Sequence, residues 1–263
     1  MIGLDFPVKP EWIHAVLRLW QPDQPIGELI QAALAQTMPE LGGEKTRRNS
    51  LTIILRYFVP TVGGGPSRRA ESRNVWAAFA RVHSAEAMAP AFLAHVIAQN
   101  EVAQEASRFI ARRWSPGHDL TSNELRRQIV TRFGERKVVT NAVSAFLRTL
   151  QYFGVLADGE RLGQYRFADL LPLSNEIFPM IVWVWWQAHL TPQIDLDEFQ
   201  ADPALAFLKS DDWAAYWRMY QPALWAIEER LDVQRATLKY GEAGLIQESL
   251  TDLLPAMPAP TSQ

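Results

Sequence analysis

Residues 115–167 read SPGHDLTSNELRRQIVTRFGERKVVTNAVSAFLRTLQYFGVLADGERLGQYRF, and this stretch decides the fold that we expect. Thr121 or Ser122 can cap a helix at its N-terminus, and Gly134 permits the left-handed backbone that closes it. A longer helix is predicted from about Glu135 to Phe153, because apolar residues recur there at every third or fourth position.

After this helix the pattern becomes that of a β-hairpin. The short β-prone runs Val155–Ala157 and Gln164–Phe167 lie on either side of Asp158-Gly159, a favoured hairpin turn. A helix, a tight turn, a longer helix and a β-hairpin follow one another in a winged helix-turn-helix. We therefore expect residues 115–171 to form such a module within a mainly α-helical chain.

The longer helix carries a polar stripe whose members are spaced four, three and four residues apart: Lys137, Asn141, Ser144 and Arg148. This spacing places them on one helix face, opposite the apolar positions. A recognition helix needs basic groups for phosphates and Asn or Arg for base edges. The stripe predicts contact with duplex DNA, although any exposed helix has a polar face and winged helices also bind other proteins.

Further basic residues could extend the predicted DNA-binding surface. Within the module they are Arg126 and Arg127 on the earlier helix, Arg132 and Arg136 near the turn, and Arg161 at the hairpin tip. Outside it they are Lys45, Arg47 and Arg48, on a helix predicted over residues 44–59. This second group can either contact DNA or form a solvated face.

The charge of the chain is strongly segregated. Residues 44–81 hold eight basic and two acidic residues, a net charge of +6, and residues 108–148 hold nine and three, again +6. Residues 190–263 hold five basic and twelve acidic residues, a net charge of −7. This asymmetry indicates either a polyanionic partner or internal pairing between the basic blocks and the acidic C-terminal part.

The regions on either side of the module are also predicted to be helical. Residues 1–114 show short periodic segments joined by tight loops, typical of a helical N-terminal domain. Residues 172–255 are rich in Trp, and Trp213, Trp217 and Trp225 follow a helical spacing that predicts a buried stripe. Residues 256–263 are expected to form a disordered tail.

One apolar run, Ile177–Leu190, includes three tryptophans. At about a dozen apolar residues it is shorter than the roughly 20 residues that a membrane-spanning helix needs. It is expected to be a buried core segment, with an aromatic partner-binding surface as the alternative. No membrane span is predicted.

The sequence carries no recognisable catalytic or metal-binding motif. It contains no cysteine, no phosphate-binding Gly-Lys-Ser/Thr loop and no close pair of histidines, since His14, His83, His95, His118 and His189 stand apart. The first ten residues lack the apolar core of a secretory signal. We expect a cytoplasmic, non-catalytic protein without cofactors, although an active site assembled from distant positions remains open.

Three segments resemble the BrxA family, small accessory proteins of bacterial BREX phage-defence systems. They are the arginine-rich helix from Thr46-Arg47-Arg48 to Phe58, the segment Ala91–Trp114 that ends in FIARRW, and the module with SAFLRTLQYFGVL. The resemblance covers roughly Lys45 to Leu173. It implies a non-catalytic DNA-binding component that acts beside a methyltransferase and ATPases, with duplex DNA and other defence proteins as partners.

Two hypotheses follow from the sequence. In the first, the chain is an accessory protein that contacts duplex DNA through the winged helix. In the second, it is an adaptor that assembles a defence or regulatory complex through its aromatic and acidic C-terminal part, without touching DNA. The placement of the basic blocks distinguishes them: exposure on one face favours the first, and cover by the acidic C-terminal part favours the second.

Overall fold

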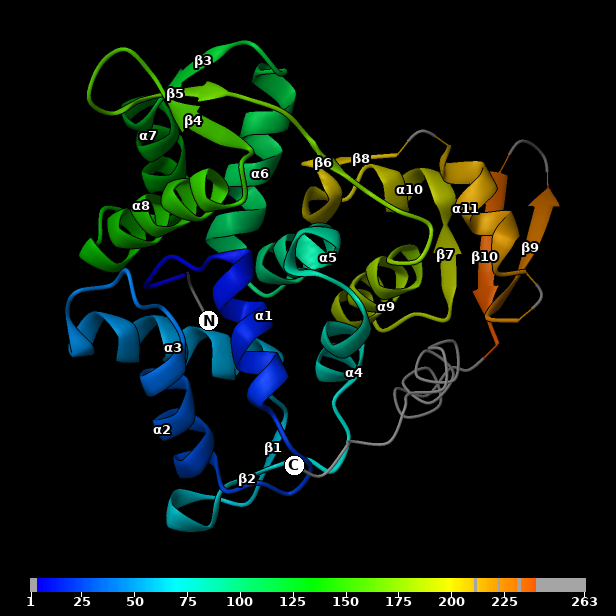
Figure 1. The fold of residues 1–263 in the computed structure, drawn as a ribbon. Coiled ribbons are helices and arrows are strands. Elements are labelled where there is room, and N and C mark those ends of the chain that lie inside the picture. Colours follow the sequence, from blue (N-terminus) through cyan, green and yellow to red (C-terminus); the bar gives the residue numbers. More distant parts are fainter. Residues whose placement is uncertain (1–3, 211, 222, 231–232, 240–263) are drawn as a thin grey trace.

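The computed structural model describes residues 4–239 except 211, 222 and 231–232, and it is mainly α-helical, as predicted. The predicted tail at residues 256–263 lies outside this range. The N-terminal region is helical (Figure 1). Its helices are α1 (Pro10–Leu19), α2 (Ile26–Gln36), α3 (Glu44–Phe58), α4 (Val75–Val82), α5 (Ala85–Ala98) and α6 (Glu101–Arg113).

A small antiparallel hairpin interrupts these helices between α3 and α4. Its strands are β1 (Thr61–Val62) and β2 (Arg69–Ala70), and a short 3-10 turn, η1 (Gly65–Ser67), lies between them. Gly63 has φ +76°, and a Cβ atom there would lie 2.9 Å from the Ser67 carbonyl oxygen. The hairpin therefore requires glycine at this position.

Helix α5 runs through the centre of the molecule. Its residues from Met88 to Ile97 are all buried, which explains why its sequence is apolar on every side. It contacts α1 and α6, and also α9 (Phe178–His189) of the C-terminal part. Because α5 joins the two parts, the core of the described chain is continuous.

The predicted module contains a three-stranded antiparallel sheet and two helices. In chain order these are β3 (Asp119–Thr121), α7 (Ser122–Phe133), α8 (Lys137–Tyr152), β4 (Leu156–Asp158) and β5 (Gln164–Phe167). The strands β4 and β5 confirm the hairpin predicted for residues 155–167, but its turn lies later than predicted: Asp158 pairs with Tyr165 at the end of β4, and residues 159–163 form the loop. Strand β3, which was not predicted, pairs with β5 and gives the order β3-β5-β4.

The ends of α7 and α8 follow from local chemistry. The Thr121 hydroxyl accepts a hydrogen bond from the Glu124 backbone N–H at 3.3 Å and donates one to the Glu124 carboxylate at 2.9 Å, so Thr121 is the cap of α7. Gly134 follows α7 with φ +81°, as its position predicted. Helix α8 begins at Lys137, two residues later than expected.

The C-terminal part is helical only in part, which corrects the prediction of a helical region over residues 172–255. Besides α9 it contains α10 (Leu196–Gln200), η2 (Pro203–Leu205) and α11 (Trp213–Met219). Strands β7 (Gln193–Asp195), β9 (Trp225–Arg230) and β10 (Val233–Leu238) form an antiparallel sheet in the order β7-β10-β9. Two shorter strands, β6 (Leu171–Pro172) and β8 (Leu208–Lys209), pair in parallel.

The alternating burial of side chains along β9 and β10 explains why these segments form strands and not helices. Ala236 and Leu238 are buried, with Thr237 between them less so, and Trp225 is buried while Ala226 is exposed. This alternation has the period of a strand. The Trp225 indole N–H donates to the Trp217 carbonyl at 2.8 Å, which connects β9 to α11.

The apolar run of residues 177–190 forms α9, and its residues from Phe178 to Trp186 are buried, as predicted. Only its end reaches the surface, where Leu190 is exposed in a left-handed conformation. Within the described part of the chain, no helix has both the length and the apolar character needed to cross a membrane.

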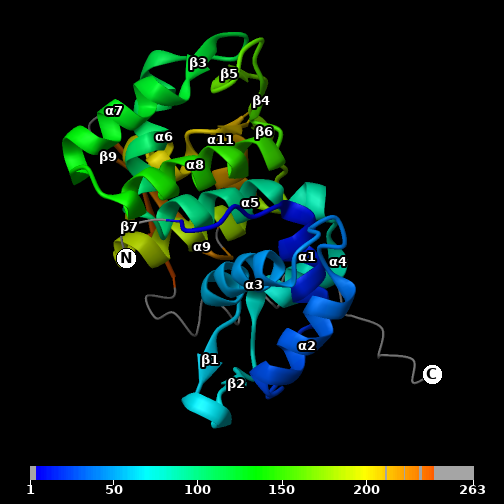
Figure 2. The same cartoon turned by 90° about the vertical axis from the view of Figure 1, so that its left-hand side faces the viewer.

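An extended N-terminal bridge, residues 4–9, joins α3 to α8. The Ser50 hydroxyl on α3 donates to the Pro7 carbonyl at 3.3 Å, and the Val8 backbone N–H donates to the Thr149 hydroxyl on α8 at 3.2 Å. Both α3 and α8 lie on the left in Figure 1 and toward the viewer in Figure 2. Helices α3 and α8, one from each basic block, therefore lie on the same side of the molecule.

Candidate functional site

The predicted polar stripe of α8 lies on the surface. Lys137, Asn141, Ser144 and Arg148 are all exposed, whereas the opposite face of the helix is buried through Val139, Val143, Phe146, Leu147 and Leu150. The Arg148 guanidinium lies 4.8 Å from the centre of the Tyr152 ring and donates to the Gln151 side chain at 3.1 Å. These contacts hold Arg148 against the helix while leaving it exposed.

Besides Arg132, which is exposed and pairs with Glu105, three other predicted residues are exposed around α8. Arg127 lies on α7, and Arg136 precedes α8 and donates to the Phe133 carbonyl at 3.0 Å. Arg161 lies in the β4–β5 loop beside Leu162, a fully exposed apolar side chain. The exposed part of the predicted surface thus extends from the α7–α8 turn to the tip of the hairpin.

Two of the predicted DNA-binding arginines make contacts that join α7 to neighbouring helices. Arg126 donates to the Ser144 hydroxyl at 3.0 Å, which links α7 to α8. Arg132 pairs with Glu105 on α6, and Arg108 pairs with the same carboxylate at 2.7 Å. Because Glu105 is buried, the two arginines neutralise a carboxylate that would otherwise be costly to bury.

The three predicted residues of α3 differ in their environments. Lys45 is exposed, whereas Arg48 is exposed but pairs with Glu44 at 2.8 Å. The hydrogen bond from Arg48 and its positive charge lower the pKa of Glu44. Arg47 is half-buried and donates to the Leu34 carbonyl at 3.3 Å. Lys45 is therefore the α3 residue best placed to meet a ligand.

The described residues of the acidic C-terminal part, up to residue 239, do not cover this face. The β7-β10-β9 sheet lies at the right of Figure 1, whereas α3 and α8 lie at the left, beyond α5. Within the described residues, α3 and α8 therefore share a side that the C-terminal sheet leaves open.

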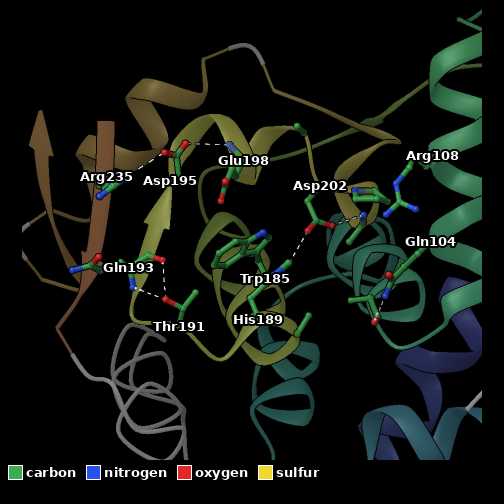
Figure 3. Close-up of a pocket in the computed structure, with 15 residues that line it drawn as sticks. Gln104, Arg108, Trp185, His189, Thr191, Gln193, Asp195, Glu198, Asp202 and Arg235 are labelled. Carbon is green, nitrogen blue, oxygen red and sulfur yellow. Dashed lines mark hydrogen bonds and ion pairs between the residues drawn. The ribbon is translucent and has the colours of Figure 1, made fainter. Parts of the chain in front are cut away.

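A cavity of about 780 Å³ lies elsewhere, among α6, the end of α9, β7, α10 and η2 (Figure 3). In it, the His189 Nε2 atom lies 2.8 Å from an Asp202 carboxylate oxygen. The Trp185 ring stacks on His189, with centroids 4.1 Å apart and planes 21° apart. Arg108, Arg235 and Glu198 also line the cavity.

Sequence reasoning missed this cavity. His189 was taken to stand alone, but the chain returns after α10 and places Asp202 beside it. No spacing motif connects these residues, because the fold alone brings them together. Among the described residues, no group of three or more His, Cys, Asp or Glu side chains is arranged to hold a metal ion.

Comparisons with known proteins identify a shared fold. No protein-family model matches the chain, and no curated protein matches its sequence. A solved structure titled "SspB crystal structure" matches with a TM-score of 0.56 and 13% identity, over 94% of this chain and 85% of the other. A second, "Magnesium ion-bound SspB crystal structure", matches with a TM-score of 0.55 and 16% identity, over 97% and 89%. The chain therefore shares its fold with both proteins over nearly its whole length.

Proposed function

We propose that this chain is a cytoplasmic, non-catalytic accessory protein that contacts duplex DNA through a winged helix-turn-helix formed by residues 115–171. The observation that carries the proposal is the exposed polar stripe of α8, on the same side of the molecule as the basic helix α3. The resemblance to the BrxA family supports a role in bacterial phage defence, beside other proteins of a BREX-like system.

The arrangement of the module supports this proposal. Helices α7 and α8 are joined by a tight turn, and the β4–β5 hairpin follows α8 in a sheet of order β3-β5-β4, which supports our assignment of this hairpin as a wing. In this reading α8 is the recognition helix and enters the major groove. Arg161 at the tip of the wing would contact the adjacent backbone.

The exposed residues divide into two roles. Arg136, Lys137 and Arg148 would neutralise phosphates, with Arg127 and Lys45 extending the surface. Asn141 is the candidate for a base edge, because an amide can form paired hydrogen bonds with adenine. Arg126 and Arg132 would act indirectly, since they hold α7 against α8 and α6.

A second candidate function is that of a protein–protein adaptor. Two exposed apolar side chains favour it, Val138 at the start of α8 and Leu162 at the tip of the hairpin. An adaptor would cover the α8 stripe with protein, so it would not bind DNA in isolation. The same experiment therefore tests both candidates.

The double variant Lys137→Ala/Arg148→Ala is expected to bind duplex DNA more weakly than wild type at every salt concentration. Each phosphate contact releases condensed counterions, so the slope of log affinity against log salt should flatten by about one unit per lost contact. Fluorescence anisotropy with a labelled duplex, over a series of salt concentrations, measures this slope.

The matched control is Lys209→Ala/Arg218→Ala, which removes the same two charges from exposed positions in the C-terminal part. This control should keep the wild-type slope. Equal affinity for the two double variants, or no DNA binding by wild type at low salt, would remove the winged helix from the proposal. Circular dichroism verifies that all variants are folded.

Substitution of Asn141 is expected to act differently. Asn141→Ala removes no charge, so the salt slope should stay unchanged. The preference among DNA sequences should fall by roughly 1–3 kcal/mol at one base position. Selection of bound sequences from a randomised duplex pool measures this preference, and a uniform loss over all sequences would contradict the assigned role.

A further inference from the structure

We infer that Val138 contacts the methyl group of a thymine, beside an adenine that Asn141 contacts, so that the chain prefers an A·T pair at this point of the major groove. Val138 is the second residue of α8 and is not a member of the polar stripe. The inference rests on the proposed function, because it takes α8 as the recognition helix. It adds to that function a residue that determines the preferred DNA sequence.

Val138 is an apolar side chain left exposed at the start of α8. Its exposed fraction is 40%, whereas Val139 and Val143 on the same helix are fully buried. Helical side chains lean toward the N-terminus of their helix, so Val138 points past the first turn, where no earlier turn of α8 covers it. Recognition helices contact base edges with their N-terminal residues. Val138 therefore lies at the end of α8 that would meet the bases.

Val138 and Asn141 are neighbours on the surface of α8. They are three residues apart, a spacing that places Cβ atoms about 5–6 Å from each other. Asn141 is exposed, and among the described residues its amide has no hydrogen-bond partner. The helix thus presents a free amide and an apolar surface side by side.

The C-terminal half of the polar stripe is already engaged within the protein. The Ser144 hydroxyl accepts from Arg126 at 3.0 Å and donates to the Thr140 carbonyl at 3.1 Å. The Arg148 guanidinium lies 4.8 Å from the centre of the Tyr152 ring, which holds it against the helix. Contacts with base edges are therefore left to the N-terminal half of α8.

The chemistry of Val138 and Asn141 fits an A·T pair. In the major groove adenine presents the N7 acceptor and the N6 donor, and an asparagine amide can form a hydrogen bond with each. Thymine adds its C5 methyl group, which suits contact with an apolar side chain. A G·C pair offers neither the adenine pattern nor the methyl group. The two side chains together therefore favour A·T over G·C.

Uracil substitution tests the thymine contact, because uracil pairs like thymine but lacks the methyl group. A sequence that wild type selects from the randomised pool is made as two unlabelled duplexes, one with thymine and one with uracil. Each competes with a labelled duplex in fluorescence anisotropy at low salt. Wild type should bind the uracil duplex about fourfold more weakly, which is the effect of one buried methyl group.

Val138→Ala should bind both duplexes alike, so that the ratio of the two affinities falls to about one. Alanine favours helix formation, so this exposed substitution should leave α8 intact. Val82→Ala is the matched control. Val82 is 37% exposed and is the last residue of α4, outside the proposed DNA surface. This control should keep the wild-type ratio.

A wild-type ratio near one, or a fourfold ratio that survives in Val138→Ala, would overturn the inference. If Lys137→Ala/Arg148→Ala still weakens binding in that case, the proposed function stands without the thymine contact. Absence of DNA binding by wild type would overturn the inference and the proposed function together, and Val138 would then suit contact with a protein partner.

Discussion

Replacing Phe178 with alanine is expected to lower the free energy of unfolding by about 3–5 kcal/mol. Phe178 is fully buried at the start of α9. Its ring lies 5.1–6.1 Å, between centroids, from five other aromatic rings: Phe199, Trp213, Tyr216, Trp217 and Trp225. These rigid rings belong to α10, α11 and β9, so they cannot easily collapse into the vacated space. The loss of apolar burial and the cavity therefore both contribute.

Guanidinium unfolding monitored by tryptophan fluorescence measures this change. Phe178→Leu retains most of the apolar volume and should lose much less stability than Phe178→Ala. A loss below about 1 kcal/mol in the alanine variant would show that this aromatic cluster is not closely packed.

Lowering the pH from 7 to 5 is expected to destabilise the protein by about 2 kcal/mol through His95 alone. His95 is buried against Phe58 and Trp76, with ring centroids 5.2 and 4.9 Å away, and its Nε2 atom lies 2.9 Å from the Tyr57 carbonyl oxygen. Burial lowers the pKa of His95 from 6.5 to about 4, against the smaller opposing effect of the hydrogen bond to Tyr57.

The sign of this pH effect follows from the pH at which His95 binds a proton in the unfolded and in the folded protein. The unfolded imidazole protonates near pH 6.5, whereas the folded imidazole stays neutral until about pH 4. Stability is therefore lost as the pH falls through this window, and His95 contributes no further change below it. Above pH 6.5 the contribution of His95 to the pH dependence disappears.

His95→Gln tests this expectation, because the amide can still donate to the Tyr57 carbonyl but does not titrate. Urea unfolding at pH 7 and pH 5 should show a smaller difference for this variant than for wild type, by about 2 kcal/mol. His118→Gln, at an exposed histidine, should keep the wild-type difference. An unchanged pH dependence in His95→Gln would assign the effect to other groups.

Where the fold depends on local pattern, the sequence predicted it. The apolar spacing of residues 135–153 predicted α8 and its buried face, and the two short β-prone runs predicted the hairpin, although its turn is the loop 159–163 and not Asp158-Gly159. Strand β3 was missed because it has only three residues, Asp119–Thr121, and its pairing partner β5 lies more than 40 residues later. A short strand of this kind is specified by its partner and not by its own sequence.

The C-terminal part shows how one pattern can fit two structures. Trp217 and Trp225 are eight residues apart, a distance that returns to the same side of either a helix or a strand. The predicted helix would have joined them, whereas in the structure Trp217 belongs to α11 and Trp225 begins β9. Both are buried, as predicted, but from two elements.

The candidate sites also differ in whether their residues lie close together in the sequence. The α8 stripe could be predicted because its residues lie on one helix. Charge counting did not show that Arg132 would pair with Glu105, 27 residues away, or that Arg126 would bind Ser144. The cavity was invisible in the sequence because its lining comes from α6, α9, β7, α10 and β10, which only the folded chain assembles.

The N-terminal bridge has a consequence for the order in which the chain folds. Val8 and Thr149 are 141 residues apart, so a ribosome adding about 5–20 residues per second makes Thr149 on the order of ten seconds after Val8. Throughout that interval the bridge has no α8 to dock against. We therefore expect docking of the bridge on α8 to be a late step, completed only after the module has left the ribosome.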